Sequence, residues 1–311
     1  MAQIILVHGI GQQHSSADQL ESAWLPSLAG GLRNIGDAGL TDRLWRGSCQ
    51  AGGIETRMAF YGHLFLRPDQ QGDDPGEFTA DETQMADELA YEWLHRSATR
   101  SSRESDRLLA LRELAFVNSQ MGEEQGVGSV LRSAVGSLGK VPWFAGPVMG
   151  MAERVIKRDL AQVTRYFTDD TLRESVQSQI LRMVDDQTKV IIGHSLGSVV
   201  AYEAAHSLGQ SLPLLITLGS PLGLETIVYQ RLRPQPPGFP SAVHHWVNVA
   251  DKEDLVAAEP DLTPFFGSSM PAGSSFDGAF TVENGSNPHN AEFYLSKKKV
   301  AEAVRSALRC G

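Results

Sequence analysis

A serine between two glycines is the first residue in this chain whose type and spacing could do chemistry. The stretch Gly193-His-Ser-Leu-Gly197 follows the β-branched run 190–192, and apolar residues at helical spacing follow it. A strand that turns sharply into a helix in this way forms a nucleophile elbow, where the glycines relieve crowding around an exposed hydroxyl. The pentapeptide alone is a weak signal, but this context makes it specific. The sequence therefore predicts that Ser195 is a nucleophile.

An acidic loop further along the chain offers the carboxylate that such a serine needs. A serine hydroxyl is a poor nucleophile at neutral pH, so it requires a histidine as general base and a carboxylate that orients the imidazole. After an elbow serine, the acid and then the histidine follow in chain order. Residues 243–249 are predicted to form a strand, which leads to Asp251, Glu253 and Asp254. We expect Asp254 to be the acid because apolar residues follow it, with Asp251 as the main alternative and Glu253 behind it.

His289 is the histidine that the chain order indicates. It is the only histidine beyond the acidic loop, and it lies between an expected short strand at 280–282 and an apolar helical pattern at 291–308. We therefore expect His289 to be the general base. His244 and His245 are adjacent on an expected strand and would point to opposite faces, which argues against a metal pair.

The N-terminal segment offers an oxyanion hole. A strand at 3–7 leads into the turn His8-Gly-Ile-Gly11. One oxyanion donor is expected to be the amide after the nucleophile, Leu196, and the second to be Ile10, with Gly11 as the alternative. We expect His8 to order the turn through hydrogen bonds. A nucleotide-binding interpretation of the turn is weak because the third glycine and a phosphate-binding lysine are missing.

Four segments of the chain resemble the lipase-like serine esterases of the α/β-hydrolase superfamily, especially the branch of proteins similar to GPI inositol-deacylase. The segments are Val7-His-Gly-Ile10, Gly193-His-Ser-Leu-Gly197, Leu218-Gly-Ser-Pro-Leu222, and Trp246-Val-Asn-Val249 with its acidic loop and the later His289. The resemblance implies an α/β-hydrolase fold, a serine–acid–histidine mechanism, and hydrolysis of acyl lipids or other hydrophobic acyl esters. Because the sequence starts directly at the histidine–glycine strand, the first strands of the full fold are expected to be absent.

The pattern of elements predicts an α/β core that is interrupted by an insertion. We expect residues 1–68 and 160–311 to form a mostly parallel sheet flanked by helices, and residues 69–159 to form a helical cap or lid. Trp143, Phe144 and Met149 are candidates for lid residues that contact the substrate. The alternatives are that they form the core of the cap or dock on a membrane surface.

Composition limits the class of protein. The 311 residues are 41% hydrophobic and carry a formal charge of −10, which fits a soluble enzyme and disfavours nucleic acid as a partner. The longest uncharged run of the cap is too short to span a bilayer, although peripheral membrane contact stays open. Two distant cysteines, Cys49 and Cys310, and no secretory signal indicate the cytoplasm. We expect no metal and no cofactor, and the oligomeric state is left open.

Two other interpretations remain. One is a catalytically silent protein of the same fold that binds a ligand or partner in the same pocket. The closer one is an acyltransferase or thioesterase, because these enzymes share the acyl-serine intermediate with an esterase. The sequence leaves the acyl length and the head group of the substrate open.

Overall fold

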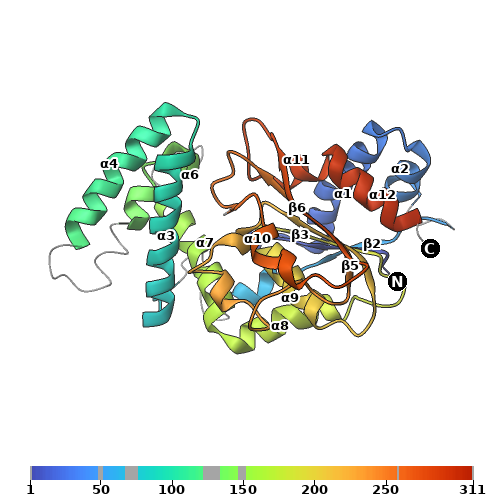
Figure 1. Cartoon of the computed structure of the whole chain (residues 1–311). Helices are drawn as coiled ribbons and strands as arrows, with labels where there is room; N and C mark the ends of the chain where they lie inside the picture. Colours follow the sequence, from blue (N-terminus) through green and yellow to red (C-terminus); the bar gives the residue numbers. More distant parts are fainter. Residues whose placement is uncertain are drawn as a thin grey trace. The chain divides into compact units, whose positions relative to one another are not determined.

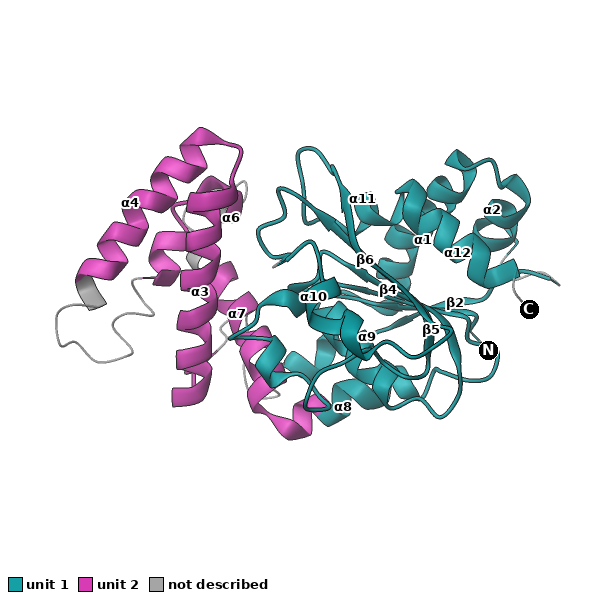
Figure 2. Cartoon of the chain, viewed as in Figure 1, with its two compact units in different colours: residues 1–65, 174–311 teal, residues 66–173 magenta. Residues whose placement is uncertain are grey.

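The computed structural model describes residues 2–47, 52–66, 76–121, 134–145, 152–257 and 259–309. They form two compact units, one of residues 1–65 and 174–311 and one of residues 66–173 (Figure 2). Met149, Cys49 and Cys310 lie outside the described residues.

The first unit contains a six-stranded sheet in which every pairing is parallel (Figure 1). Its order is β2-β1-β3-β4-β5-β6. The strands are β1 (Ile4–Val7), β2 (Thr56–Ala59), β3 (Val190–His194), β4 (Leu212–Leu218), β5 (Val243–Asp251) and β6 (Ser275–Val282). Uninterrupted apolar runs such as those of β1 and β3 are typical of parallel strands that are covered on both faces. The prediction of an α/β fold with a parallel sheet flanked by helices is confirmed.

The strand order reverses between β1 and β3. The chain passes outward from β1 to β2, returns to the other side of β1 as β3, and then continues in the opposite direction to β6. In open α/β sheets, the crevice that receives a ligand lies beyond the carboxyl ends of the strands at such a reversal. His8 directly follows β1 and Ser195 directly follows β3. Two of the segments predicted to do chemistry therefore leave the sheet at this point.

Helices cover both faces of the sheet. On one face, α1 (Ala17–Asn34) packs against α11 (Ala291–Leu295) and α12 (Lys298–Arg309), and α12 contacts β3, β4 and β5. On the other face, α9 (Leu196–His206) packs against β1, β3 and β4. The remaining helices of this unit are α2 (Ala38–Trp45), α10 (Thr263–Phe266), four short 3-10 turns, and most of α8 (Asp170–Leu181).

Alternate strand residues supply the buried core. Side chains at every second position, such as Ile4 and Leu6 on β1, form one buried cluster with Trp24 and Leu28 of α1. The residues between them point to the opposite face, because successive side chains of a strand alternate. Ile5 is one of these, and it is also fully buried. Burial on both faces makes the sheet a rigid platform for the loops at its carboxyl edge.

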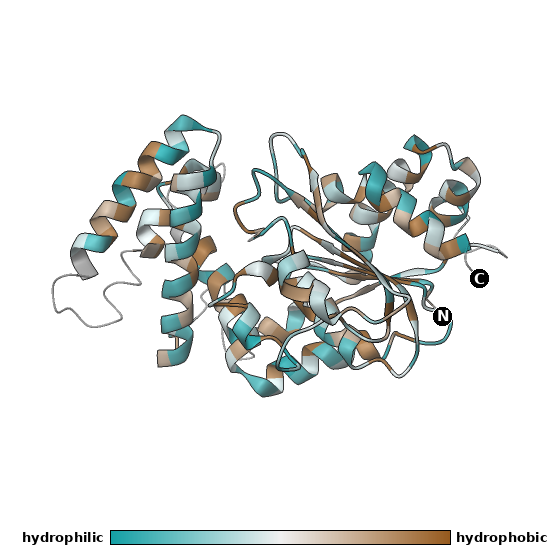
Figure 3. Cartoon of the chain, viewed as in Figure 1, coloured by the Kyte–Doolittle hydropathy of each residue, from teal (hydrophilic) through white to brown (hydrophobic). Residues whose placement is uncertain are grey.

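In the described residues of the second unit, all regular secondary structure is helical. It comprises α3 (Ala80–Arg100), α4 (Glu104–Met121), a short helical stretch at 134–138, α6 (Pro142–Ala145) and α7 (Ala152–Thr168). A capping box begins α3, since Thr79 and Glu82 each accept a hydrogen bond from the other's backbone N–H. Hydrophilic and hydrophobic bands follow one another along α4 (Figure 3). The expected role of this region as a lid stays a prediction.

Within the described residues, no helix has both the length and the hydropathy required to cross a lipid bilayer.

Candidate active site

Ser195 occupies a strained backbone conformation between β3 and α9. Its φ of 55° and ψ of −130° make it the one non-glycine residue with positive φ in the described part of the chain. Such strain persists only where the surroundings enforce it. Here the Ser195 N–H donates to the Leu218 carbonyl at 3.0 Å, and the Ser198 hydroxyl donates to the Ser195 carbonyl at 2.5 Å. The serine predicted as the nucleophile is therefore fixed from both its amide and its carbonyl.

Packing explains the two glycines of the elbow. A Cβ on Gly193 would overlap the backbone of Gly197 and Ser198, where the chain turns back on itself. A Cβ on Gly197 would overlap the carbonyl oxygens of Val7 and His8 at the end of β1. The first glycine allows the turn, and the second allows the start of α9 to approach the neighbouring strand.

The segment after β1 lies directly against the nucleophile. A Cβ on Gly9 would come within 2.8 Å of the Ser195 Cβ and 3.3 Å of its hydroxyl oxygen. Ile10 follows, and then Gly11 with a φ of 76°. Leu196 is the first residue of α9, where backbone N–H groups have no partner within the helix. The predicted oxyanion donors Ile10 and Leu196, and the alternative Gly11, thus lie on the two segments that border Ser195.

His8 is buried and orders this turn. Its Nε2 accepts the N–H of Tyr61 at 3.1 Å, so its Nδ1 carries the proton and donates to the Gly9 carbonyl at 2.7 Å. The Tyr61 ring stacks on the imidazole with centroids 4.0 Å apart. Burial lowers the pKa of His8 to about 4, so the ring is neutral at physiological pH.

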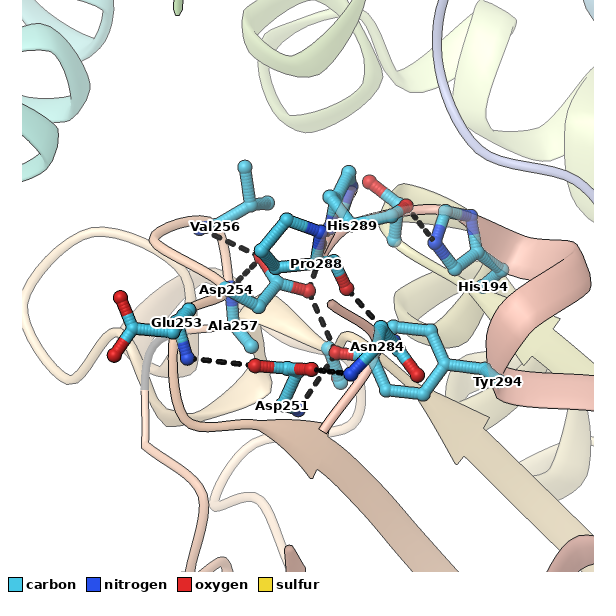
Figure 4. A network of polar contacts seen from close by, with 12 residues as sticks. His194, Asp251, Glu253, Asp254, Val256, Ala257, Asn284, Pro288, His289 and Tyr294 are labelled. Carbon is cyan, nitrogen blue, oxygen red and sulfur yellow. Dashed lines mark hydrogen bonds and ion pairs between the residues drawn. The ribbon is translucent and has the colours of Figure 1, made fainter. Parts of the chain in front are cut away.

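The buried Asp254 and the partly exposed His289 form a hydrogen-bonded pair (Figure 4). The Nδ1 of His289 donates to Oδ2 of Asp254 at 2.8 Å, and Asp254 is fully buried. Its other oxygen accepts the N–H groups of Val256 and Ala257 at 3.0 and 3.1 Å. Burial alone would raise the pKa of Asp254, but His289, the Tyr294 hydroxyl and the Ala257 amide together hold it below its usual value. Asp254 is therefore a charged acceptor for the imidazole.

Asp251, the alternative acid, faces backbone amides instead. Its oxygens accept the N–H of Glu253 at 2.7 Å and the N–H of Asn284. Burial raises the pKa of Asp251 despite these two hydrogen bonds. Asp251 thus ties the acidic loop to the loop that precedes His289, and Glu253 takes part through its backbone. The structure brings Asp254 to His289.

Tyr294 joins the two aspartates and was not predicted from the sequence. Its hydroxyl accepts the N–H of Asp251 at 2.7 Å and donates to Oδ2 of Asp254 at 2.8 Å. Tyr294 is fully buried on α11, four residues after the Asn290 cap of that helix. No motif marks it. The apolar helical pattern indicates only that it is buried.

The segment after β4 completes the wall beside this pair. A Cβ on Gly219 would lie 2.7 Å from Oδ2 of Asp254 and 3.2 Å from Nδ1 of His289, and the φ of Gly219 is 52°. Ser220 follows, and its hydroxyl lies 2.7 Å from that of Ser198. This contact supports the Ser198 hydroxyl that holds the elbow.

His194 connects the loop of His289 to the elbow. Its Nε2 lies 2.9 Å from the His289 carbonyl oxygen, and the two imidazole centroids are 4.7 Å apart. Because His194 directly precedes Ser195, this contact joins the backbone of His289 to the residue before the predicted nucleophile. Ser195, Asp254 and His289 thus follow β3, β5 and β6 at one edge of the sheet. In general, a histidine that is oriented by a carboxylate can activate a nearby hydroxyl by general base catalysis.

The aromatic candidates for the lid lie within the second unit. Phe144 stacks on Trp93 of α3 with centroids 5.9 Å apart, and Trp143 meets Phe144 edge-on at 4.6 Å. Both side chains are half-buried, and Met149 lies outside the described residues. Their contact with a substrate stays a prediction. In the described ranges, no group of three or more potential ligands could hold a metal ion.

Comparison with models of protein families, with curated proteins and with solved structures found no match.

Proposed function

We propose that this protein is a serine hydrolase of the α/β-hydrolase superfamily that cleaves carboxylic esters through an acyl-serine intermediate. One observation carries the proposal. A buried carboxylate, Asp254, binds the Nδ1 of His289 at 2.8 Å, beside an elbow that presents Ser195 with a φ of 55°. The four segments that resemble lipase-like serine esterases support acyl lipids or other hydrophobic acyl esters as the substrates.

Each residue has a distinct role in the proposed mechanism. Asp254 occupies Nδ1 of His289, so Nε2 is the nitrogen that takes the Ser195 proton as the hydroxyl attacks the ester carbonyl. The N–H groups of Ile10 and Leu196 stabilise the resulting oxyanion, and one such donor is typically worth about 3 kcal/mol in the transition state. The tetrahedral intermediate collapses, and His289 returns the proton to the departing alcohol. Water, activated by the same imidazole, then hydrolyses the acyl-serine.

Labelling with a fluorophosphonate tests the proposal, because the reagent forms a covalent adduct only with an activated serine. Intact-protein mass is measured for the native chain and for Ser195→Ala and His289→Ala. Matched controls are Ser207→Ala and His244→Ala, which alter an exposed serine and an exposed histidine of the same unit. We expect one adduct on the native chain and on both controls, and none on Ser195→Ala or His289→Ala.

Two results would contradict the proposal. If the folded native chain formed no adduct, the silent binding protein would replace the enzyme. If the adduct formed on Ser195→Ala as well, another serine would be the nucleophile. A turnover assay with competing alcohols then separates hydrolysis from acyl transfer, because an acyltransferase would pass the acyl group to the alcohol in preference to water.

A further inference from the structure

His194 lies between Gly193 and Ser195 in the elbow. Its side chain is buried. It is 8% exposed, at the end of β3. The Trp24 ring of α1 meets the imidazole edge-on with ring centroids 6.1 Å apart, and the centroid of the Tyr294 ring of α11 is also 6.1 Å from that of the imidazole. These aromatic neighbours leave the imidazole directed toward the loop that carries His289 (Figure 4).

Two side chains hold the loop that carries His289 by donating hydrogen bonds to consecutive backbone carbonyls, those of Pro288 and His289. The Asn284 side-chain amide donates to the Pro288 carbonyl at 2.9 Å, and Nε2 of His194 donates to the His289 carbonyl at 2.9 Å. After these, the Asn290 side chain accepts the N–H of Phe293 and begins α11. Of these three bonds, the one from His194 starts on the same strand–helix turn as the nucleophile.

We propose that His194 is a positioning residue, which holds the backbone of His289 so that the turn presenting Ser195 also fixes the base that must reach it. This inference rests on the proposed function. It assigns a role to the side chain between Gly193 and Ser195, which the mechanism above does not use.

The protonation state of His194 suits this role. A carbonyl only accepts hydrogen bonds, so Nε2 of His194 must carry a proton. Burial, and then the neighbouring His289, lower the pKa of His194 to about 3. The ring is therefore neutral, and no second positive charge opposes the imidazolium that forms on His289, whose ring centroid is 4.7 Å away.

Inactivation kinetics separate positioning from binding. For the fluorophosphonate, the limiting rate kinact reports the chemical step and KI reports reagent binding. His194→Phe keeps a ring but removes the donor. We expect its kinact to fall about 10- to 100-fold with KI unchanged, because small misplacements of catalytic groups cost rates of this order. His194→Gln places an amide N–H near the position of Nε2, and we expect it to recover kinact to within about threefold of the native value.

The chain offers a control in His206, which is half-buried. Its Nε2 lies 3.2 Å from a backbone carbonyl, that of Gly238, at the other end of α9. His206→Phe therefore removes the same kind of bond away from the site, and we expect kinact to stay at the native value. Circular dichroism and thermal unfolding establish that each variant is folded. His194→Leu replaces His194→Phe in the comparison if the latter does not fold.

Each outcome decides the inference. Native kinact in a folded His194→Phe or His194→Leu overturns the inference. A folded His194→Gln that is as slow as His194→Phe also overturns it, since restoring a hydrogen-bond donor would then not restore the rate. If the native chain itself is not labelled, the proposed function fails. Normal labelling of the native chain with no effect at position 194 removes the positioning role alone.

Discussion

At the residue scale, two buried aspartates only three positions apart have different side-chain partners and opposite pKa shifts. Asp254 accepts bonds from an imidazole, a phenol and two amides, and its pKa is lowered. Asp251 accepts two backbone amides, and burial raises its pKa. The first environment favours a permanent charge beside His289. The second favours a structural link between two loops.

We expect Asp254→Asn to lower the rate of fluorophosphonate labelling about 10⁴-fold, because an amide at this position stabilises the wrong tautomer of the histidine. Asp251→Asn removes no contact to His289, so its labelling rate should stay within about tenfold of native in folded protein. Rapid-quench mass spectrometry measures both rates. The opposite order of the two variants would make Asp251 the acid of the site.

The two aspartates should also give opposite pH dependences of stability. A carboxyl with a lowered pKa in the folded state contributes stability above its unfolded pKa of roughly 3.9, and this is lost as the pH falls through the folded pKa. A carboxyl with a raised pKa contributes stability below roughly 3.9, and this is lost as the pH rises through the folded pKa.

Urea unfolding of native, Asp254→Asn and Asp251→Asn proteins between pH 2.5 and 6 checks these directions. The advantage of native protein over Asp254→Asn should grow as the pH rises, and its advantage over Asp251→Asn should shrink. Parallel curves for the two variants would show that the aspartates do not differ in this way.

Residue types and chain order were sufficient to indicate Ser195 and His289, because an elbow is local and no other histidine follows the acidic loop. They could not separate Asp254 from Asp251 with certainty, because that choice depends on how a loop folds back toward α11. Tyr294 was missed for the same reason. Its contacts reach 40 and 43 positions back along the chain, and its spacing indicates only a buried helical residue.

At the scale of elements, buried parallel strands were the most predictable because their apolar runs are continuous. The last strand was expected only at 280–282, whereas β6 begins at Ser275. Its first half contains Ser275, Asp277 and Gly278, and the strand lies at the edge of the sheet, where burial imposes little pattern. The helix α2 was not predicted. It is short, and Asp37 caps it through the N–H of Leu40.

Because α9 lies close to β1, alanine substitutions at two helical glycines should have opposite effects on the free energy of unfolding. A methyl group on Gly197 would meet the backbone oxygens of Val7 and His8, which cannot rotate away. We expect Gly197→Ala to lower the free energy of unfolding by about 1–3 kcal/mol and to reduce labelling of Ser195.

Gly30 of α1 is the matched control, since a Cβ there meets no atom within 4 Å. Gly30→Ala should raise the free energy of unfolding by about 0.5–1 kcal/mol through helix propensity, with labelling unchanged. Urea denaturation measures both changes. Equal stability of the two alanine variants would falsify the close contact between α9 and β1.

At the scale of the whole molecule, two buried neutral histidines should govern unfolding in acid. The pKa values of His8 and His194 are lowered to about 4 and about 3, whereas an unfolded chain binds these protons near pH 6.5. The unfolded state therefore takes up more protons as the pH falls below about 6.5, and each histidine costs up to roughly 1.4 kcal/mol of stability per pH unit.

The slope of unfolding free energy against pH, measured between pH 6.5 and 4.5, tests this expectation. His194→Gln should reduce the slope by up to roughly 1.4 kcal/mol per pH unit, because one proton fewer is taken up on unfolding. The exposed His244→Gln serves as control and should leave the slope as in the native chain. An unchanged slope in His194→Gln would mean that His194 is not the source of the acid sensitivity.

The reversal of strand order means that a break in the chain between β2 and β3 would separate neighbouring strands of the sheet. Residues 66–173 separate β1 and β2 from β3, yet β1 is the neighbour of β3 in the sheet. The turn with Ile10 belongs to the first stretch of sequence, whereas Ser195, Asp254 and His289 all belong to the last. A protease that cut within 66–173 would divide the proposed oxyanion donors between two polypeptides, which non-covalent contacts such as the pairing of β1 with β3 and the packing of α1 against α11 and α12 would keep together.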